Sequence, residues 1–191
     1  MDTVATPPAG VPHRKVVLLR GINVGKSARI PMADLRACTE AAGCAEVTTV
    51  LATGNVTVTD PRTVEELRTV LEAAYADRFG YDAVVQVLPL ADLSVAVESY
   101  PFDVLADHHD YVVFSDDTAV TTRVATAMLE ALDDPGAGTE AVAGGPGCVY
   151  WRVSRGATLT SAAAAVLDDR ANRRHLTTRN IKTLRKILAA G

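Results

Sequence analysis

The stretch "EVTTVLATGNVTVTD", residues 46–60, decides the fold because it places two runs of β-branched residues on either side of Thr53-Gly54-Asn55. Valine and threonine favour pleated strands. Glycine and asparagine tolerate the positive φ angles that tight hairpin turns require. The stretch therefore predicts two antiparallel strands joined by a hairpin turn.

The segments around this hairpin complete a known unit. "KVVLLR", residues 15–20, predicts a buried strand, and residues 31–43 repeat apolar positions at helical spacing. After the hairpin, Thr63 and Glu66 have the spacing of a capping box, which marks the start of a helix. "DAVVQVL", residues 82–88, predicts a further strand. The order strand, helix, strand, strand, helix, strand is that of the ferredoxin-like fold.

The second half of the chain repeats most of this order. Residues 89–99 and 118–132 have helical periodicity, and residues 110–115 predict a strand between them. A Gly-Pro-Gly turn then separates two predicted strands, and helices follow at residues 158–167 and 181–191. We therefore expect a second β-α-β-β-α unit, similar to the first in element order only.

These patterns divide the chain into three parts. Residues 1–13 contain no apolar run and no basic start, which predicts a flexible arm rather than a signal peptide or a membrane anchor. Residues 14–89 form the first predicted lobe. Residues 90–191 form a second α+β lobe that ends in a basic helix.

The composition is that of a globular protein. Of its 191 residues 48% are hydrophobic, which is enough for a packed core. No apolar stretch approaches the roughly 20 residues that a membrane helix requires, so we expect no membrane partner. The cysteines Cys38, Cys44 and Cys148 lack zinc-ligand spacing, and their odd number predicts reduced thiols in the cytoplasm.

The net charge of −4 is distributed unevenly. From residue 170 onward the chain contains seven basic residues and no acidic one, so the remainder carries −11. Such asymmetry indicates an anionic partner, but a solvated basic face that balances an acidic body gives the same pattern. The basic residues are Arg170, Arg173, Arg174, Arg179, Lys182, Arg185 and Lys186.

The loop "RGINVGKSARIP", residues 20–31, has some features of a phosphate-binding loop. The loop of nucleotide hydrolases has four residues between its two glycines, whereas Gly21 and Gly25 enclose three. In addition, Ile30-Pro31 favours a helix that starts several residues after the lysine. The spacing therefore argues against a nucleotide hydrolase.

The predicted topology brings this loop close to the hairpin turn. A β-α-β crossover returns the chain to a strand parallel to the first, so both strands end at the same edge of the sheet. Backbone N–H groups and side-chain donors at this edge suit an anion or a polar ligand. Alternatively, the glycines only make tight turns and the asparagines bond their own backbone. The candidate ligand-binding residues here are Arg20, Gly21, Asn23, Gly25, Lys26, Thr53, Gly54 and Asn55.

A second candidate lies near the C-terminus. In "TTRNIKT", residues 177–183, Asn180 is a good N-cap for the helix that follows. Thr177, Thr178 and Arg179 are expected beside the N–H groups of its first turn, where anions bind. Alternatively, the segment only caps a helix that docks on the body of the protein.

Five segments occur in a distinctive order: "LLRGINVGKSARIPMADLR", "TGNV", "YPF", "VYW" and "TTRNIKT". In the order and residues of these segments, the sequence resembles the family called Domain of Unknown Function 1697, and the resemblance extends over nearly the whole chain after residue 13. Lys26 stands where the family has a second glycine, and Thr53 where it has serine. The resemblance implies an α+β protein of two ferredoxin-like lobes, with mainly antiparallel sheets and helices packed on them. It implies no particular activity.

The remaining residues provide no convincing catalytic set. "FDVLADHHD", residues 102–110, gathers aspartates and histidines, but adjacent positions of an extended segment point to opposite sides. The spacing of a helical zinc-binding histidine pair is absent from the sequence. We therefore expect no metal and no cofactor, and the sequence assigns no catalytic residue.

The leading hypothesis is a cytoplasmic protein that binds a phosphate-bearing ligand, with nucleic acid favoured, through the loop at residues 19–25 and the helix start at residues 177–180. One alternative is an enzyme that acts on a small phosphorylated or carboxylated metabolite. It would use Arg20, Lys26 and Arg179 as clamps in a deep pocket between the lobes. The other alternative is a structural or protein-interaction module.

Overall fold

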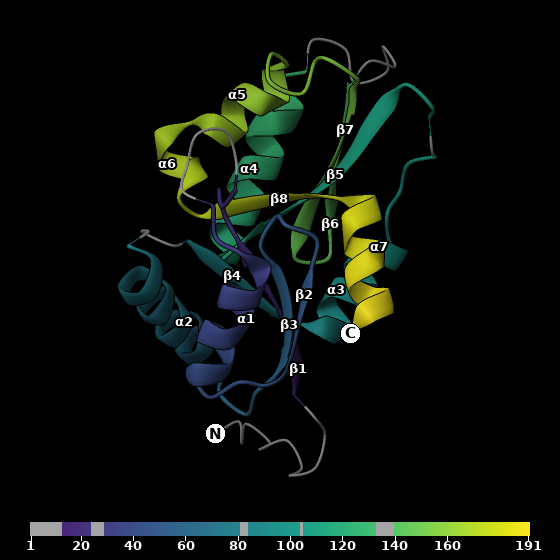
Figure 1. The fold of residues 1–191 in the computed structure, drawn as a ribbon. Coiled ribbons are helices and arrows are strands. Elements are labelled where there is room, and N and C mark those ends of the chain that lie inside the picture. The colour runs from purple at the N-terminus through teal and green to yellow at the C-terminus, as the bar shows by residue number, and fades with distance from the viewer. Residues whose placement is uncertain (1–12, 24–28, 81–83, 104, 133–139) are drawn as a thin grey trace, which may run out of the picture.

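The computed structural model describes residues 13–23, 29–80, 84–103, 105–132 and 140–191 (Figure 1). Of the predicted arm at residues 1–13, only His13 lies within these ranges. The candidate residues Gly25 and Lys26 lie outside the described residues.

The first sheet consists of β1 (Arg14–Leu19), β2 (Ala45–Val50), β3 (Asn55–Thr59) and β4 (Val85–Pro89). The strand order is β2-β3-β1-β4, and all neighbours are antiparallel. The predicted hairpin is confirmed, because β2 and β3 pair directly. β1 and β2 flank β3, so they run in the same direction and end at the same edge of the sheet, as the ferredoxin-like order requires.

Two helices, α1 (Met32–Ala41) and α2 (Val64–Phe79), pack on one face of this sheet. The predicted capping box at the start of α2 is confirmed. The Thr63 hydroxyl accepts from the Glu66 N–H at 3.2 Å, and the Glu66 carboxylate accepts from the Thr63 N–H at 2.8 Å. Both N–H groups would otherwise lack an intrahelical partner, so the sequence itself fixes where α2 begins.

The second sheet consists of β5 (His108–Ser115), β6 (Glu140–Gly145), β7 (Cys148–Ser154) and β8 (Leu176–Asn180). Its strand order is β6-β7-β5-β8, again antiparallel throughout. α4 (Thr118–Glu130) and α5 (Ala162–Asp168) pack on one face, and the short α6 (Arg170–Arg173) leads into β8. The molecule is therefore the expected α+β protein, with two four-stranded antiparallel sheets and helices packed on them, consistent with two ferredoxin-like lobes.

Strand β8 corrects the expectation for the segment before the last helix. Thr177, Thr178 and Arg179 directly precede the N-cap of α7, but they belong to a strand that the sequence did not predict and that pairs with β5. The β-branched threonines suit this position, and pairing with β5 satisfies their backbone groups. The predicted cap itself is confirmed, since the Asn180 side chain accepts from the Lys182 N–H at 2.9 Å. With β8, the second unit has the complete β-α-β-β-α-β order.

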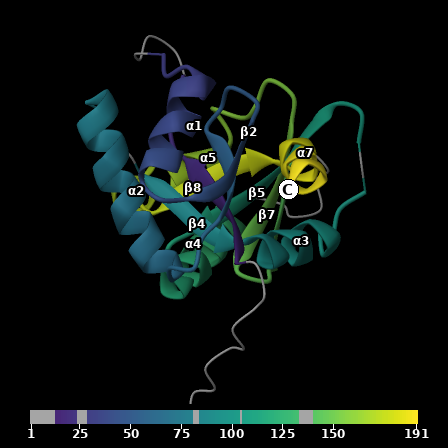
Figure 2. The same ribbon diagram turned by 60° about the horizontal axis from the view of Figure 1, so that its bottom comes forward.

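Two further helices, α3 (Leu90–Glu98) and α7 (Ile181–Ala190), join the sheets (Figures 1 and 2). They lie side by side and pack on the face of the first sheet opposite α1 and α2. Their apolar side chains form one buried cluster with residues of both sheets, so the two halves share a central core. The predicted boundary between residues 89 and 90 stays a prediction. The cluster includes Val16, Leu18, Leu93, Ala96, Val112, Phe114, Tyr150, Ile181, Leu184 and Ile187.

None of the helices within the described ranges is long and apolar enough to cross a membrane.

Candidate ligand site between the sheets

The end of β1 lies against the hairpin turn, as the topology predicted. The Leu19 N–H donates to the Gly54 carbonyl at 2.8 Å, and the Arg20 N–H donates to the Val84 carbonyl at 2.9 Å. Backbone hydrogen bonds of this kind hold the first residues after β1 in a fixed position. The sheet edge therefore gathers residues that are about thirty positions apart in sequence.

Gly54 permits this close approach. Its φ is +75°, in the left-handed region that other residues adopt only at a cost. A Cβ atom at this position would lie 2.9 Å from the Leu19 Cβ and equally close to the Ile22 side chain. Gly54 is thus required by packing, and it does not line the cavity described below.

We expect Gly54→Ala to lower the free energy of unfolding by about 2 kcal/mol, because it adds both backbone strain and overlap with buried side chains. Gly144→Ala is the matched control, since a Cβ atom there meets nothing within 4 Å and no positive φ is involved. Urea unfolding of both variants measures the difference. Equal stability of the two variants would contradict the assignment.

The two asparagines of the candidate set bond to the protein itself. Asn23 donates from Nδ2 to the carbonyls of Ile30 and Ala52, at 3.0 and 2.8 Å, and its Oδ1 accepts from the Ile30 N–H at 2.7 Å. Asn55 is fully buried and donates to the Val50 carbonyl at 2.8 Å. These hydrogen bonds agree with the alternative in which the asparagines bond the backbone of the protein instead of a ligand.

Arg179 also bonds to the protein. Its guanidinium is buried and donates from Nε to Asn55 Oδ1 at 2.7 Å, and from Nη2 to the Leu19 carbonyl at 2.5 Å. On its own strand, Nη1 donates to Thr177 Oγ1 at 2.8 Å and to the Thr178 carbonyl at 3.0 Å. The hydrogen bonds of Arg179 therefore connect β8 of the second sheet to β1 and to the start of β3 in the first sheet.

A cavity of about 620 Å³ opens beside this junction. Seven of the twelve predicted residues line it: Arg20, Gly21, Asn23, Thr53, Thr177, Thr178 and Arg179. Gly54, Asn55 and Asn180 do not, and Gly25 and Lys26 lie outside the described residues. Leu176 of β8 lines the cavity beside those seven residues. A second group of lining residues comes from β5, β7, the turn after β7 and α5, and consists of Tyr111, Trp151, Thr158, Leu159, Ala164, Leu167 and Asp168.

The sequence did not predict that the residues of this second group line a site. Tyr111 and Trp151 are directly paired across β5 and β7, and their rings stack with centroids 5.1 Å apart and planes 27° apart. Leu159 lies between β7 and α5 and is 92% exposed. The register of two strands separated by some forty residues is what brings the rings together, and no local pattern encodes that register.

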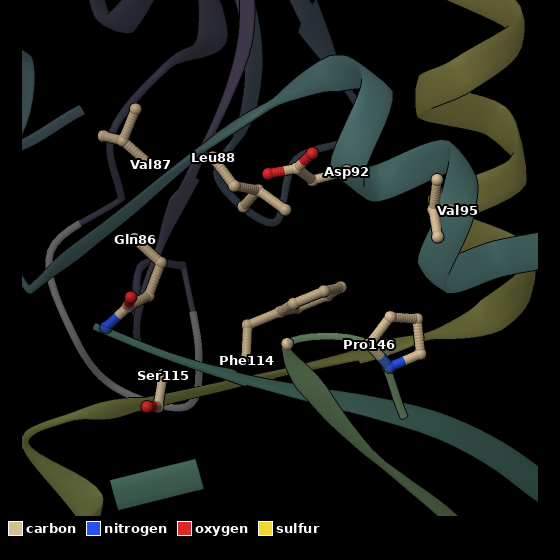
Figure 3. Close-up of a pocket in the computed structure, with 9 residues that line it drawn as sticks. Gln86, Val87, Leu88, Asp92, Val95, Phe114, Ser115 and Pro146 are labelled. Carbon is tan, nitrogen blue, oxygen red and sulfur yellow. The ribbon is translucent and has the colours of Figure 1, made fainter. Parts of the chain in front are cut away.

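A second cavity, of about 280 Å³, lies between α3 and the second sheet (Figure 3). Figure 3 shows Asp92, Leu88 and Phe114 directed into the same space. The nine described residues that line it include the carboxylate of Asp92 and no lysine or arginine. This lining disfavours an anionic ligand. The larger cavity also contains a carboxylate, that of Asp168, but Arg20 and Arg179 line it as well, so it is the better candidate for an anion.

The cations of the C-terminal segment do not form one surface. Arg170, Arg173 and Arg174 lie before β8, whereas Lys182, Arg185 and Lys186 lie on α7 after it. Figure 1 shows α6 and α7 at opposite ends of β8. Arg179, in β8, is buried. A continuous basic face over the whole segment is thus absent from this described part of the chain.

Among the residues that the structure describes, no three histidine, cysteine, aspartate or glutamate side chains gather as metal ligands.

Comparison with known proteins finds a matching family model and similar solved structures. A family model described as "Protein of unknown function (DUF1697)" matches residues 13–150. Among solved structures, the chain is similar to the conserved bacterial protein SP0830 from Streptococcus pneumoniae, with 27% sequence identity and a TM-score of 0.72. That likeness covers 93% of this chain and 97% of the other, so it extends over both sheets. No curated protein matches the sequence.

Proposed function

The chain belongs to the DUF1697 family of proteins of unknown function, and from that premise we propose that it binds a small phosphorylated or carboxylated molecule in the cavity between its two sheets. One observation carries the proposal: segments from both halves of the chain line a single cavity that includes Arg20. A volume of about 620 Å³ lies within the range of small-molecule sites, which are mostly apolar with a few polar groups.

Arg20 is the residue that we assign to the anionic group. It directly follows β1, is partly buried, and has its backbone fixed by the bond to Val84. Guanidinium groups bind phosphate and carboxylate oxygens through paired hydrogen bonds, so arginine is suited to both ligand classes. Thr53 and Thr178 line the same cavity and add hydroxyl groups.

A small ligand is a better fit than nucleic acid. Binding to a polyanion requires a run of cations along the backbone of the nucleic acid. The C-terminal cations are divided between the two ends of β8, and the Arg179 guanidinium donates to protein acceptors. A compact anion needs only the local set around Arg20.

The test is isothermal titration calorimetry at low salt with ribose 5-phosphate, adenosine monophosphate and citrate. We expect at least one of them to bind. Arg20→Ala should lower its affinity by about tenfold or more, because the loss of a charge-assisted hydrogen bond corresponds to a change of that size. Arg185→Ala, at an exposed cation of α7, is the matched control and should bind as the wild type does.

Two results would overturn this assignment. One is the absence of binding by all three probes. The other is undiminished binding by an Arg20→Ala protein that unfolds at the same urea concentration as the wild type. A single-stranded oligonucleotide serves as the comparison. If it alone binds, and its affinity falls steeply with added salt, the protein uses a polyanion surface instead of the cavity.

A further inference from the structure

Tyr111 presents a fixed aromatic ring to the cavity. Its ring stacks on that of Trp151, which is 2% exposed and donates from Nε1 to Glu140 at 2.7 Å. The indole is therefore locked in place and supports one side of the phenol ring. Tyr111 itself is only partly buried and lines the cavity, so it can offer a planar apolar surface to a ligand.

Leu159 stands at the rim of the same cavity. It is 92% exposed, far more than the other large exposed hydrophobic side chains of the described residues. The turn that carries it is closed by hydrogen bonds from the N–H groups of Thr160 and Ser161 to the Ala157 carbonyl, both at 3.0 Å. The side chain is thus held at the cavity in contact with water, and covering it with an apolar group would be favourable.

The two sides of the cavity differ in character. The side formed by the end of β1, the hairpin turn and β8 carries Arg20, Thr53 and Thr178. The side formed by β5, β7, the turn after β7 and α5 is mainly apolar, with Ala164 and Leu167 beside the aromatic pair, and its polar members are Thr158 and Asp168. A sugar phosphate would satisfy the polar side and leave the apolar side in contact with hydroxyl groups. A ligand with an anionic end and a planar apolar end would satisfy both.

We propose that the ligand carries a planar aromatic ring as well as its anionic group, as a nucleoside monophosphate or an aromatic carboxylate does, and that the ring stacks on Tyr111 beside Leu159. The inference rests on the proposed function, because it takes Arg20 as the anchor of the anionic end. It adds the chemical class of the other end. Stacking on an aromatic side chain tolerates different rings, since each has a π-face.

The experiment compares three probes by calorimetry: adenosine monophosphate, ribose 5-phosphate, which lacks the ring, and adenosine, which lacks the phosphate. We expect adenosine monophosphate to bind at least about fivefold more tightly than ribose 5-phosphate, as one stacked base provides. Tyr111→Leu should bring the two affinities close together by weakening the nucleotide alone. Tyr111→Phe should preserve the difference.

Leu159→Ala tests the binding of the aromatic end of the ligand without the risk of unfolding the protein, because the Leu159 side chain is almost fully exposed. It should weaken binding of the nucleotide and leave ribose 5-phosphate unaffected, whereas Leu129→Ala, at an exposed leucine of α4, should change neither.

The outcomes separate the two proposals. Equal affinities for adenosine monophosphate and ribose 5-phosphate would overturn the ring inference and leave the anion site intact. Tight binding of adenosine with no gain from the phosphate would overturn the anion site and leave the stacking surface. A Tyr111→Leu protein that retains the full preference for the nucleotide would show that Tyr111 only packs against the core.

Discussion

Replacing Arg179 with methionine is expected to lower the free energy of unfolding by about 3–5 kcal/mol. Methionine fills much of the same volume but cannot donate. The Leu19 carbonyl and Asn55 Oδ1 would then lose a charged donor in a buried place. Because these acceptors lie in the first sheet and Arg179 in the second, the loss falls on the junction between the sheets. Urea unfolding measures the effect.

Two further variants identify the cause. Arg185→Met removes an exposed arginine from α7 and should change stability by no more than about 0.5 kcal/mol. Arg179→Lys keeps the charge but not the planar fork of donors, so it should recover only part of the lost stability. Full recovery with lysine would mean that charge alone matters. Wild-type stability of Arg179→Met would refute a structural role for the guanidinium.

The local elements of the fold could be predicted because each depends on neighbouring residues. The hairpin follows from Gly54 and Asn55 between β-branched runs, and the start of α2 follows from Thr63 and Glu66. The meeting of β1 with the hairpin turn also followed, since a β-α-β crossover returns the chain to a strand parallel to the first and both strands then end at the same edge of the sheet.

The role of Arg179 could not be predicted in the same way. An arginine beside threonines and an asparagine looks the same whether its partner is a phosphate or a buried carbonyl, because the donors are identical. Only the position of β8 against β1 decides, and β8 itself was missed because Asn180 is both the last residue of a strand and a helix cap. The first unit did contain a signal: a β-α-β-β-α order that recurs should end in a strand.

The aromatic side of the cavity was missed for a different reason. Tyr111 and Trp151 each lie in a strand that has apolar residues on both faces of the sheet. An alternating pattern of apolar and polar residues is therefore missing, and the sequence does not indicate which ring reaches a cavity. Their pairing depends on the register between β5 and β7. Leu159 gave no signal, since a single exposed leucine is ordinary on a protein surface.

Tyr100 and Phe102 of the motif "YPF", residues 100–102, contact the buried residues Asp110 and Arg152 and do not line the cavity. The Tyr100 hydroxyl donates to Asp110 Oδ1 at 2.6 Å, and Arg152 donates from Nε to the same oxygen at 3.1 Å. Arg152 also donates to the Asp103 carbonyl and lies over the Phe102 ring, 5.0 Å from its centroid. Burial, with the bond to Asp110, raises the pKa of the Tyr100 phenol, which therefore remains a donor. These contacts hold Tyr100 and Asp103, which follow α3, against β5 and β7.

Asp110→Ala is expected to lower the free energy of unfolding by about 3–5 kcal/mol, because it removes the acceptor of two donors, Tyr100 and the buried Arg152, and leaves the Arg152 guanidinium without its ion-pair partner. Asp77→Ala, at an exposed aspartate of α2, is the control and should stay within about 0.5 kcal/mol of the wild type. Urea unfolding gives both values.

The double variant Asp110→Ala/Arg152→Met decides whether the cost comes from the stranded charge. If it does, the double variant is more stable than Asp110→Ala alone, because the unpaired guanidinium has been removed together with its partner. We expect a coupling of about 1–3 kcal/mol between the two positions in the complete mutant cycle. Additive losses would instead assign the cost to the Tyr100 hydrogen bond and to packing, and Tyr100→Phe would then reproduce part of the effect of Asp110→Ala.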